Sequence, residues 1–333
     1  MHLLALPRWP LAQLPTPLQE ARNLRAALSG PRIFVKRDDL TGLALGGNKT
    51  RKLEYLIADA RQQGATVVIT TGAAQSNHCR QTAAAARHAG LRCVLVLSST
   101  DAEPPIQGNL LLDYLLGAEV HIVRDRTERQ PAMERIADEL RQRGERPYLI
   151  PAGGSTPLGA AAYVAAAFEL TQQLIALGTE VSRVYVTSST SGGTHAGLAL
   201  GTKLCGEPFR VVGIAIEEDA GAVRGVVLPL ANATAEFLQV DTRLEADDLH
   251  IDDRHVGPGY AIPTPACFEA IRLAAQTEGL LLDPVYTGKT LAGLIDHIRN
   301  GEIGRDETVV FVHTGGAPAL FAQADWIVAS LRG

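Results

Sequence analysis

The sequence predicts an α/β fold with a mostly parallel, twisted sheet, and three observations lead to this prediction. Short β-branched runs alternate with longer amphipathic stretches along most of the 333 residues, which is typical of strands that alternate with helices. Hydrophobic residues make up 46% of the chain and charged residues 20%, so the chain can bury a large core and is not mainly disordered. Glycines and small polar residues gather where strands should give way to helices, and open sheets bind ligands at that edge.

The first half of the chain alternates regularly between the two patterns. Its strands are short runs of β-branched residues, such as TVVITT, and Gly64 ends the first long helix. We predict strands over 33–36, 66–71, 92–97, 119–123 and 148–150, and helices over 51–63, 77–89, 108–116 and 131–143.

The turn-rich segment Pro151–Gly159 interrupts the alternation, and we place a domain boundary near it. Beyond this segment the two patterns resume. We predict strands over 183–187, 211–216 and 308–313, and helices over 160–176, 194–204, 265–278, 290–300 and 318–324. The stretch 220–258 fits neither pattern and stays unassigned, with room for a substrate-specific loop.

Charge and composition exclude several classes of function. The chain has 31 Lys and Arg against 36 Asp and Glu, a formal charge of −5, so we expect no nucleic-acid partner and no anionic membrane surface. No apolar stretch reaches the roughly 20 residues that a spanning helix needs. Four prolines break the N-terminal 17 residues, which excludes the apolar helix of a secretory signal, and we expect a cytoplasmic protein. The four scattered cysteines form no C-x-x-C pair, so we expect neither a disulfide framework nor a metal site.

The run Leu45–Glu54 places a lysine, Lys49, at the start of a predicted helix behind Gly46 and Gly47. The positive end of the helix dipole disfavours an ammonium group there, and burial lowers the pKa of a lysine in the same direction. A neutral amine is what Schiff-base chemistry requires. The alternative is an ordinary solvated lysine on a helix.

The run Thr187–Gly197 follows a β-branched strand and opens a helix. It combines hydroxyl groups, two adjacent glycines and the positive end of a helix, which are the components of a phosphate site. The run contains no Lys or Arg, so it suits a small phosphomonoester better than a nucleoside triphosphate with its metal.

Three more polar runs are expected to be turns between a strand and a helix. Gly72–Arg80 contains Ser76 and Asn77, which suit a helix N-cap, and free amides at such an end bind carboxylates. A capping loop without a ligand is the alternative. The other two runs are Leu282–Thr290 and His313–Pro318.

Two nucleotide-binding motifs are absent. The Walker motif needs a lysine directly after its second glycine, but Asn48 separates Gly47 from Lys49. The run Gly288-Lys289-Thr290 lacks the earlier glycine, because Asp283 stands there. No G-x-G-x-x-G run follows a predicted strand either, so neither an ATP-dependent enzyme nor a nicotinamide dehydrogenase is supported.

A lysine amine, a separate phosphate site and polar strand ends without metal ligands point to pyridoxal 5′-phosphate. Six motifs, in order along nearly the whole chain, closely resemble the family of D-cysteine desulfhydrase and 1-aminocyclopropane-1-carboxylate deaminase. They are Val35–Asp39, the GGNKTRKLE run around Lys49, Gln75–His78, Gly192–Thr194, Asp283–Tyr286 and Thr314–Gly316.

The resemblance implies the type II pyridoxal-phosphate fold, similar to the tryptophan synthase β-subunit, with two three-layer α/β domains. A small domain over 54–158 would be inserted in a large cofactor-binding domain formed by 1–53 and 159–333, and the protein would be a homodimer. The matched positions imply the following roles: Lys49 for the Schiff base; Asn77 for the phenolic oxygen of the cofactor; Thr190, Ser191, Gly192, Gly193 and Thr194 for its phosphate; Tyr286 for stacking on the ring and for acid–base chemistry; Thr314 for the pyridine nitrogen; and Ser76, Asn77, His78 and Tyr260 for the substrate.

One departure favours a branch of this family. The deaminase branch has a glutamate after the stacking tyrosine, facing the pyridine nitrogen, whereas this chain has Thr287. A carboxylate would keep that nitrogen protonated and strengthen the electron sink, which a hydroxyl does not do. Opening a cyclopropane ring needs the stronger sink, while eliminating a thiolate does not.

The resemblance therefore implies a pyridoxal-phosphate-dependent lyase of amino-acid and sulfur metabolism. We expect it to convert D-cysteine by β-elimination to pyruvate, ammonia and hydrogen sulfide, with Lys49 as the base, helped by Tyr286 or Ser76. Three alternatives stay open. The chain could be an L-cysteate sulfo-lyase that releases sulfite, because that branch shares the MHL…LPTPL start and the SNH loop. It could also be a 1-aminocyclopropane-1-carboxylate deaminase, or a pyridoxal-phosphate-binding regulator without catalysis.

Overall fold

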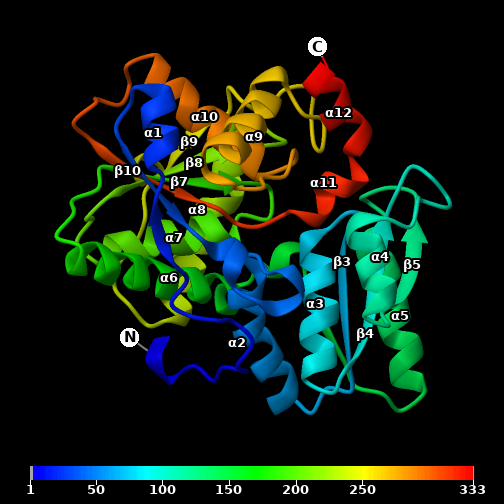
Figure 1. Ribbon diagram of the computed structural model, residues 1–333. Helices are drawn as coiled ribbons and strands as arrows, with labels where there is room; N and C mark the ends of the chain where they lie inside the picture. The colour runs from blue at the N-terminus through cyan, green and yellow to red at the C-terminus, as the bar shows by residue number, and fades with distance from the viewer. Residues whose placement is uncertain (1–2, 333) are drawn as a thin grey trace.

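The computed structural model describes residues 3–332 and contains two twisted sheets, each covered by helices on both faces (Figure 1). Residues 1, 2 and 333, the outermost residues of the predicted large domain, lie outside the described part. The smaller sheet is fully parallel, in the order β5-β4-β3-β6. Its strands are β3 (Val67–Ala73), β4 (Arg92–Ser98), β5 (Glu119–Val123) and β6 (Pro147–Ile150).

The larger sheet has the order β1-β2-β10-β7-β8-β9, and all of its pairs are parallel except that of β1 with β2 at one edge. Its strands are β1 (Leu18–Glu20), β2 (Arg32–Lys36), β7 (Arg183–Ser188), β8 (Arg210–Ala215), β9 (His250–Asp252) and β10 (Thr308–Val312).

The helices join these strands in the alternation expected of an α/β protein. They are α1 (Arg22–Leu28), α2 (Lys49–Gln62), α3 (Asn77–His88), α4 (Gly108–Leu115), α5 (Arg129–Gln142), α6 (Pro157–Ala176), α7 (Gly193–Leu204), α8 (Ala220–Phe237), α9 (Pro265–Glu278), α10 (Thr287–Arg299), α11 (Pro318–Ala322) and α12 (Ala324–Arg332).

Side chains along each strand point alternately to the two faces of the sheet, and each face contributes to a different hydrophobic core. Along β3, Val67 and Ile69 pack against α5, whereas Val68 packs among residues of α2 and α3 on the other face. Along β10, Val309 and Phe311 face α9 and α10, and Val310 faces α6. This period of two buries both faces of each strand, so both sheets form the middle layer of a three-layer unit.

The predicted strands and helices are present, with ends shifted by a few residues. Helix α6 begins at Pro157 rather than 160, because the hydroxyl of Thr156 caps it by accepting a bond from the Gly159 amide. The expectation of a strand before Leu282 is wrong. The segment between α9 and α10 carries no strand, so the Leu282–Thr290 run joins two helices.

The unassigned stretch 220–258 is mainly helix α8, followed by the edge strand β9. Asp219 caps α8, and Val223, Val227, Ala231 and Ala235 are all buried on one face at a spacing of four residues. Gly221, Gly225 and Pro229 on the other face obscure this periodicity in the sequence. Four further elements, β1, α1, β9 and α12, are not in the sequence-based prediction.

The division into domains over 54–158 and the rest of the chain stays a prediction. All four strands of the smaller sheet lie within 67–150, and those of the larger sheet lie within 18–36 and 183–312. The proposed boundary at 53–54 falls inside helix α2. Near the C-terminus, α11 contacts α4, and the side-chain amide of Gln107 donates to the carbonyl of Ala322 at 3.2 Å.

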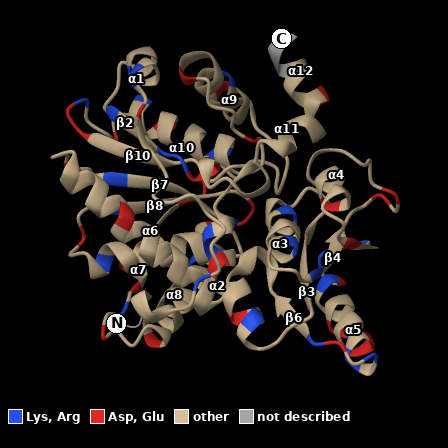
Figure 2. Ribbon diagram, turned by 60° about the horizontal axis from the view of Figure 1, so that its bottom comes forward, with Lys and Arg blue, Asp and Glu red and all other residues tan. Residues whose placement is uncertain are grey.

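Charged side chains of both signs are mixed over the visible helices, with α5 as an example (Figure 2). Within residues 3–332, no helix combines the length and the apolar character needed to cross a bilayer.

Candidate active site

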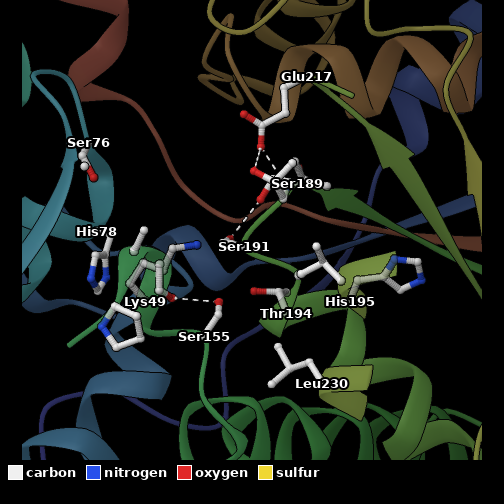
Figure 3. Close-up of a pocket in the computed structure, with 18 of the residues that line it drawn as sticks. Lys49, Ser76, His78, Ser155, Ser189, Ser191, Thr194, His195, Glu217 and Leu230 are labelled. Atoms are coloured by element: carbon white, nitrogen blue, oxygen red, sulfur yellow. Dashed lines mark hydrogen bonds between the residues drawn. The ribbon is translucent and has the colours of Figure 1, made fainter. Parts of the chain in front are cut away.

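The carboxyl ends of strands from both sheets surround one cavity of about 820 Å³, a volume in the range of small-molecule sites. Residues beyond β3, β7, β8 and β10 contribute to its lining, as does the start of α2. Of the predicted site residues, all except Gly193 line this cavity: Lys49, Ser76, Asn77, His78, Thr190, Ser191, Gly192, Thr194, Tyr260, Tyr286 and Thr314. In Figure 3, Ser76 and His78 lie on one side, Ser191 and Thr194 on the other, and Lys49 between them.

Lys49 is the first residue of α2, and its side chain is partly exposed to the cavity. Burial lowers the pKa of its amine to about 8. The position at the helix terminus acts in the same direction, because positive partial charge accumulates there. A substantial fraction of Lys49 is therefore neutral near physiological pH, as a nucleophilic amine requires.

Three polar runs far apart in the sequence meet at Asn48. Its amide donates to the carbonyl of Thr314 at 3.0 Å, and its side chain donates to the hydroxyl of Thr194 at 3.0 Å. Gly315 has φ +95°, and a Cβ there would lie 2.9 Å from the Cα of Gly47. Only glycine permits this approach, which brings the loop after β10 against the loop that carries Lys49.

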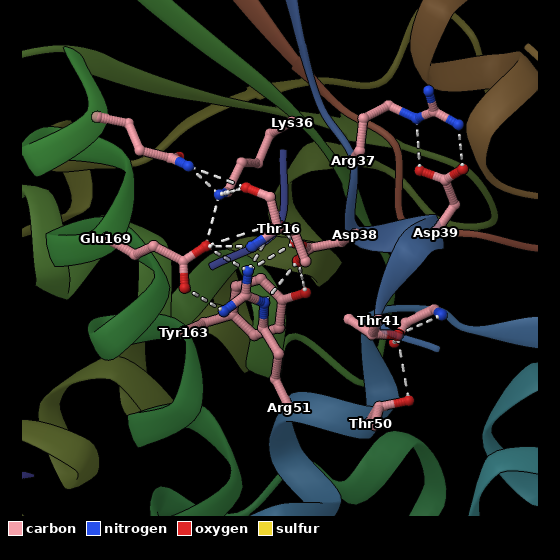
Figure 4. A network of polar contacts seen from close by, with 12 residues as sticks. Thr16, Lys36, Arg37, Asp38, Asp39, Thr41, Thr50, Arg51, Tyr163 and Glu169 are labelled. Carbon is pink, nitrogen blue, oxygen red and sulfur yellow. Dashed lines mark hydrogen bonds and ion pairs between the residues drawn. The ribbon is translucent and has the colours of Figure 1, made fainter. Parts of the chain in front are cut away.

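Helix α2 is anchored beside Lys49 by a buried polar network (Figure 4). Arg51 donates to Asp38 at 2.8 and 3.0 Å and to Glu169 at 2.8 and 2.9 Å. Burial raises the pKa of Asp38, but the charge of Arg51 outweighs that effect and holds the pKa below its ordinary value. Thr16, Lys36 and Tyr163 complete the network, which we call the Arg51 network. It fixes the turn of helix that presents Lys49.

The loop after β7 leads into helix α7, whose first amides have no partner within the helix. Gly192 has φ +67° at the N-cap. The amide and the hydroxyl of Thr190 both donate to Glu217, so a role for Thr190 in holding phosphate requires Glu217 to release it. The other donors of this loop are Ser189, Ser191 and the first turn of α7.

A lysine that the sequence reasoning missed lies beside this loop. Lys52 is buried, and its amine donates to the carbonyl of Gly153 at 3.1 Å and to the hydroxyl of Ser155 at 3.4 Å. A Cβ at Gly193 would lie 2.9 Å from its Nζ. Burial, followed by the charge of Lys49, lowers the pKa of Lys52, whereas a nearby phosphate favours its charged form. The sequence could have pointed to Lys52 through its spacing from Lys49, since residues three apart share a helix face. A basic side chain from α2 therefore lies beside the loop that is predicted to hold the phosphate.

The loop after β3 presents polar groups from the opposite side of the cavity. The hydroxyl of Ser76 caps α3 by accepting from the Cys79 amide at 3.2 Å. The Nε2 atom of His78 lies 2.8 Å from the hydroxyl of Thr70, and its Nδ1 is buried without a protein hydrogen-bond partner among the described residues. Burial, followed by the charges of Lys49 and Lys52, holds the pKa of His78 well below its usual range. His78 is therefore neutral at physiological pH, with one ring nitrogen left unpaired among the described residues.

Asn77 is oriented by a residue for which the sequence carries no signal. Asn109 donates to the side-chain oxygen of Asn77 at 3.0 Å and to the carbonyl of Gln75 at 2.9 Å. With its oxygen engaged, the side-chain NH₂ of Asn77 is left to donate. This is the orientation that the role predicted for Asn77 needs.

Tyr260 and Tyr286 form a pair at the cavity, with their hydroxyl oxygens 2.6 Å apart. Burial raises the pKa of Tyr260 to about 12 and that of Tyr286 well above its ordinary value, so both keep their protons. Asp283 accepts from the amide of Tyr286 at 2.9 Å and fixes its turn.

Thr287 lies outside the cavity lining. Its hydroxyl donates to Asp283 at 2.7 Å and accepts from the Asp283 amide at 2.8 Å. It is therefore fully engaged in the turn before α10. Thr314, by contrast, lines the cavity, as its predicted role requires.

These groups fit pyridoxal 5′-phosphate. Lys49 supplies an amine that is partly neutral near physiological pH, and Lys52 lies beside the start of α7, where the phosphate is predicted to bind. Asn77, Tyr286 and Thr314 face the space between them. Within the described residues, no group of three His, Cys, Asp or Glu side chains is placed to hold a metal ion.

Comparisons with known proteins identify the family and the fold. The family model described as "Pyridoxal-phosphate dependent enzyme" matches residues 10–315. D-cysteine desulfhydrases of Salmonella choleraesuis and Salmonella typhi are each 43% identical over 325 residues, covering 96% of this chain and 97% of theirs. A crystal structure described as an ACC deaminase homologue superposes with a TM-score of 0.90 at 38% identity, covering 98% of both chains. A threonine deaminase from Solanum lycopersicum superposes with a TM-score of 0.69 at 16% identity, covering 98% of this chain and 86% of its own, and shows the fold alone.

Proposed function

The chain belongs to the family of pyridoxal-phosphate-dependent enzymes, and we propose that it is a lyase that converts D-cysteine to pyruvate, ammonia and hydrogen sulfide. One observation carries the proposal: the amine of Lys49, with a pKa lowered to about 8, faces the same cavity as the α3 loop and the Tyr260–Tyr286 pair. The D-cysteine desulfhydrases of Salmonella, which are 43% identical, support the substrate.

When bound, pyridoxal phosphate supplies an electron sink for the negative charge that develops on the substrate α-carbon. The start of α7 and Lys52 would hold the cofactor's phosphate, and the Asn77 amide and the Thr314 hydroxyl would hold its ring. Thr314 would be a neutral partner for the ring nitrogen, so the sink would be weaker than one with a carboxylate partner. A good leaving group such as a thiolate suits this arrangement better than a cyclopropane ring does.

The α3 loop binds the substrate carboxylate in this proposal. The first amides of α3, the hydroxyl of Ser76 and the ring of His78 lie together on one side of the cavity. A helix N-terminus is suited to a carboxylate because its amides donate and its dipole is positive there. Binding the carboxylate on this side turns the α-carbon toward Lys49.

Lys49 then acts as the base that removes the α-proton. A pKa of about 8 is close to the working pH, which suits a general base. The Tyr260–Tyr286 pair, protonated through its raised pKa values, donates a proton from a hydroxyl oxygen to the departing sulfur. The carbon–sulfur bond breaks with its electron pair on sulfur.

We also propose a homodimer in the cytoplasm, as the family resemblance implies. Light scattering tests the dimer.

A second candidate function is deamination of 1-aminocyclopropane-1-carboxylate, favoured by the 38% identical ACC deaminase homologue.

Two products test the function: pyruvate released from D-cysteine, L-cysteate and β-chloro-D-alanine, and the four-carbon 2-oxo acid 2-oxobutanoate released from 1-aminocyclopropane-1-carboxylate. We expect release from D-cysteine and β-chloro-D-alanine. Turnover of 1-aminocyclopropane-1-carboxylate alone would contradict the proposal, and a cofactor-loaded protein that releases a 2-oxo acid from none of these substrates would indicate a regulator.

Replacing the base tests the assignment of Lys49. We expect Lys49→Ala to lose at least about 1,000-fold in kcat/KM and to change the visible absorbance of the bound cofactor. Lys203, paired with Asp248 outside the cavity, is the matched control, and Lys203→Ala should keep both. An unchanged spectrum and rate in Lys49→Ala would contradict the assignment.

A further inference from the structure

The loop that is predicted to hold the cofactor's phosphate makes a carboxylate contact that the chemistry above does not use. The carboxylate belongs to Glu217, which follows strand β8 and lines the cavity. The amide of Thr190 donates to its Oε1 atom at 2.8 Å, and the hydroxyl of Thr190 donates to the same oxygen. Glu217 points toward this loop in Figure 3. Two donors of the loop therefore have an anionic acceptor within the protein.

Other donors of the loop bond neutral acceptors. The hydroxyls of Ser189 and Ser191 lie 3.0 Å apart, and the amide of Gly193 donates to the hydroxyl of Ser155 at 3.3 Å. A hydroxyl can turn and donate to an incoming phosphate, whereas a carboxylate can only accept. Among the described residues that line the cavity, Glu217 is the only one with a carboxylate. It is therefore the one group of the lining whose charge has the same sign as a phosphate.

A cation lies next to Glu217 but does not bond it. Arg126, in the segment between β5 and α5, donates from Nη2 to the hydroxyl of Thr190 at 2.9 Å. Its Nη1 atom lies 3.8 Å from Oε2 of Glu217, which is too long for a hydrogen bond. The Arg126 side chain is 59% exposed and that of Glu217 is 10% exposed, so the arginine has the room to move. The two residues come from the two sheets and approach each other across the cavity.

The contact with Glu217 and the role predicted for Thr190 exclude each other. An amide has one proton to donate, and so has a hydroxyl. A phosphate that takes these donors has to displace the carboxylate. A phosphate that leaves the carboxylate in place has to bind beside a negative charge, which repels it. In both cases Glu217 weakens the binding of the phosphate.

We propose that Glu217 is an internal competitor of the cofactor's phosphate, and that Arg126 binds Glu217 when the phosphate displaces it. A shift of about 1 Å would turn the 3.8 Å contact into a charge-assisted hydrogen bond. Because the two side chains come from different sheets, cofactor binding would strengthen a contact across the cavity. The inference concerns the cofactor alone and holds whichever amino acid is processed.

The test separates the phosphate of the cofactor from its ring. Dialysis of the holoenzyme against falling cofactor concentrations gives Kd for pyridoxal phosphate. Competition with the cofactor gives the inhibition constants of inorganic phosphate and of pyridoxine, which has the ring without the phosphate. Glu217→Gln removes the charge but keeps an acceptor for Thr190. We expect it to lower Kd for pyridoxal phosphate and the constant for inorganic phosphate at least fivefold, and to change the constant for pyridoxine less than twofold.

Two further variants test the specificity of this effect. Glu218 is exposed and lies outside the cavity lining, so Glu218→Gln removes the same charge and should change none of the three constants. Arg126→Gln should raise Kd for pyridoxal phosphate at least threefold, because Glu217 then has no cation to bind. The double variant Arg126→Gln/Glu217→Gln should bind the cofactor as Glu217→Gln does, since Arg126 acts through Glu217.

Unchanged or weaker binding of pyridoxal phosphate by Glu217→Gln would overturn the inference, because Glu217 would then order the loop rather than compete for it. An equal change for inorganic phosphate and pyridoxine would overturn it as well, since the effect would not depend on the phosphate. A double variant that binds the cofactor at least threefold more weakly than Glu217→Gln would show that Arg126 binds the phosphate directly. None of these measurements involves turnover, so the proposed function would stand in each case.

Discussion

Two buried polar regions flank Lys49, and they differ in how many of their polar atoms have hydrogen-bond partners. On the side of the larger sheet lies the Arg51 network, in which all four guanidinium contacts to Asp38 and Glu169 are 3.0 Å or shorter. None of its buried side-chain atoms lacks a partner within the described residues. Such a network holds its helix in a single position.

On the side of the smaller sheet, helices α3 and α4 carry several buried polar atoms without protein partners. We call this group the α3–α4 wall. The unpartnered atoms, among the described residues, are Nδ1 of His78, Nε and Nη1 of Arg80, Oδ1 of Asn109, and both carboxylate oxygens of Asp113. Only the loop at its start, from Ser76 to His78, reaches the cavity.

The difference indicates that the two regions have different roles in the site. Lys49, which must be positioned accurately, lies on a helix that is held by the Arg51 network. In this network, moving any residue would break several hydrogen bonds. The side that we assign to the substrate keeps unused hydrogen-bonding capacity, and regions with unsatisfied polar groups open at lower free energy. We therefore expect changes in the Arg51 network to affect stability, and changes at the cavity end of the α3–α4 wall to affect substrate binding.

The largest effect should come from breaking the Arg51 network. We expect Asp38→Asn to lower the free energy of unfolding by about 3–5 kcal/mol, because it leaves part of a buried charge without its partner. Urea unfolding at neutral pH measures the change.

The neighbouring residue provides the control. Asp39 pairs with Arg37, and both side chains are more exposed than those of Asp38 and Arg51. Asp39→Asn should cost less than about 1 kcal/mol. Equal losses for Asp38→Asn and Asp39→Asn would mean that the Arg51 network has no special role.

The second effect should appear in substrate binding rather than in stability. Ser76→Ala removes the cap of α3, at a cost of about 1 kcal/mol in stability. It also removes a proposed hydrogen bond to a charged carboxylate, worth about 1.5–3 kcal/mol. We therefore expect kcat/KM to fall by roughly 10- to 100-fold, mainly through KM.

Thr264 separates the two effects. It caps α9 by accepting from the Cys267 amide at 3.1 Å and lies outside the cavity lining. Thr264→Ala should lose a similar amount of stability while KM stays the same. If both variants change KM alike, the effect of Ser76 is only structural.

The sequence was sufficient for most of the fold because hydrophobic periodicity and glycine positions are local signals. It failed at α8, where Gly221, Gly225 and Pro229 interrupt the pattern although the buried face repeats every four residues. It also failed before Leu282, where a turn-rich run looked like the end of a strand. There, the packing of α9 and α10 decides the structure.

At the site, the sequence indicated the loops and their glycines but not the side chains that approach from elsewhere. Lys52 could be anticipated from its spacing to Lys49. Asn109, Glu217 and Arg126 could not, because they reach the cavity or its lining loops only through the tertiary fold and lie outside any motif.

The last effect depends on pH and concerns the far end of the α3–α4 wall, where burial raises the pKa of Asp113 to about 8 against the opposing charge of Arg80. The neighbouring thiols of Cys79 on α3 and Cys93 on β4 are kept protonated by the same burial. Between about pH 4 and pH 8 the folded protein thus holds a proton on Asp113 that the unfolded chain releases, so this residue's contribution to stability falls as the pH rises.

Asparagine does not titrate. The free energy of unfolding of Asp113→Asn, relative to the wild type, should therefore grow by about 1.4 kcal/mol per pH unit from pH 5 to pH 7 and level off above pH 8. Urea unfolding at several pH values measures it, with the exposed Asp138→Asn on α5 as a control that should stay within about 0.5 kcal/mol. A difference independent of pH would mean that Asp113 is ionised and paired with Arg80, and that the α3–α4 wall is as saturated as the Arg51 network.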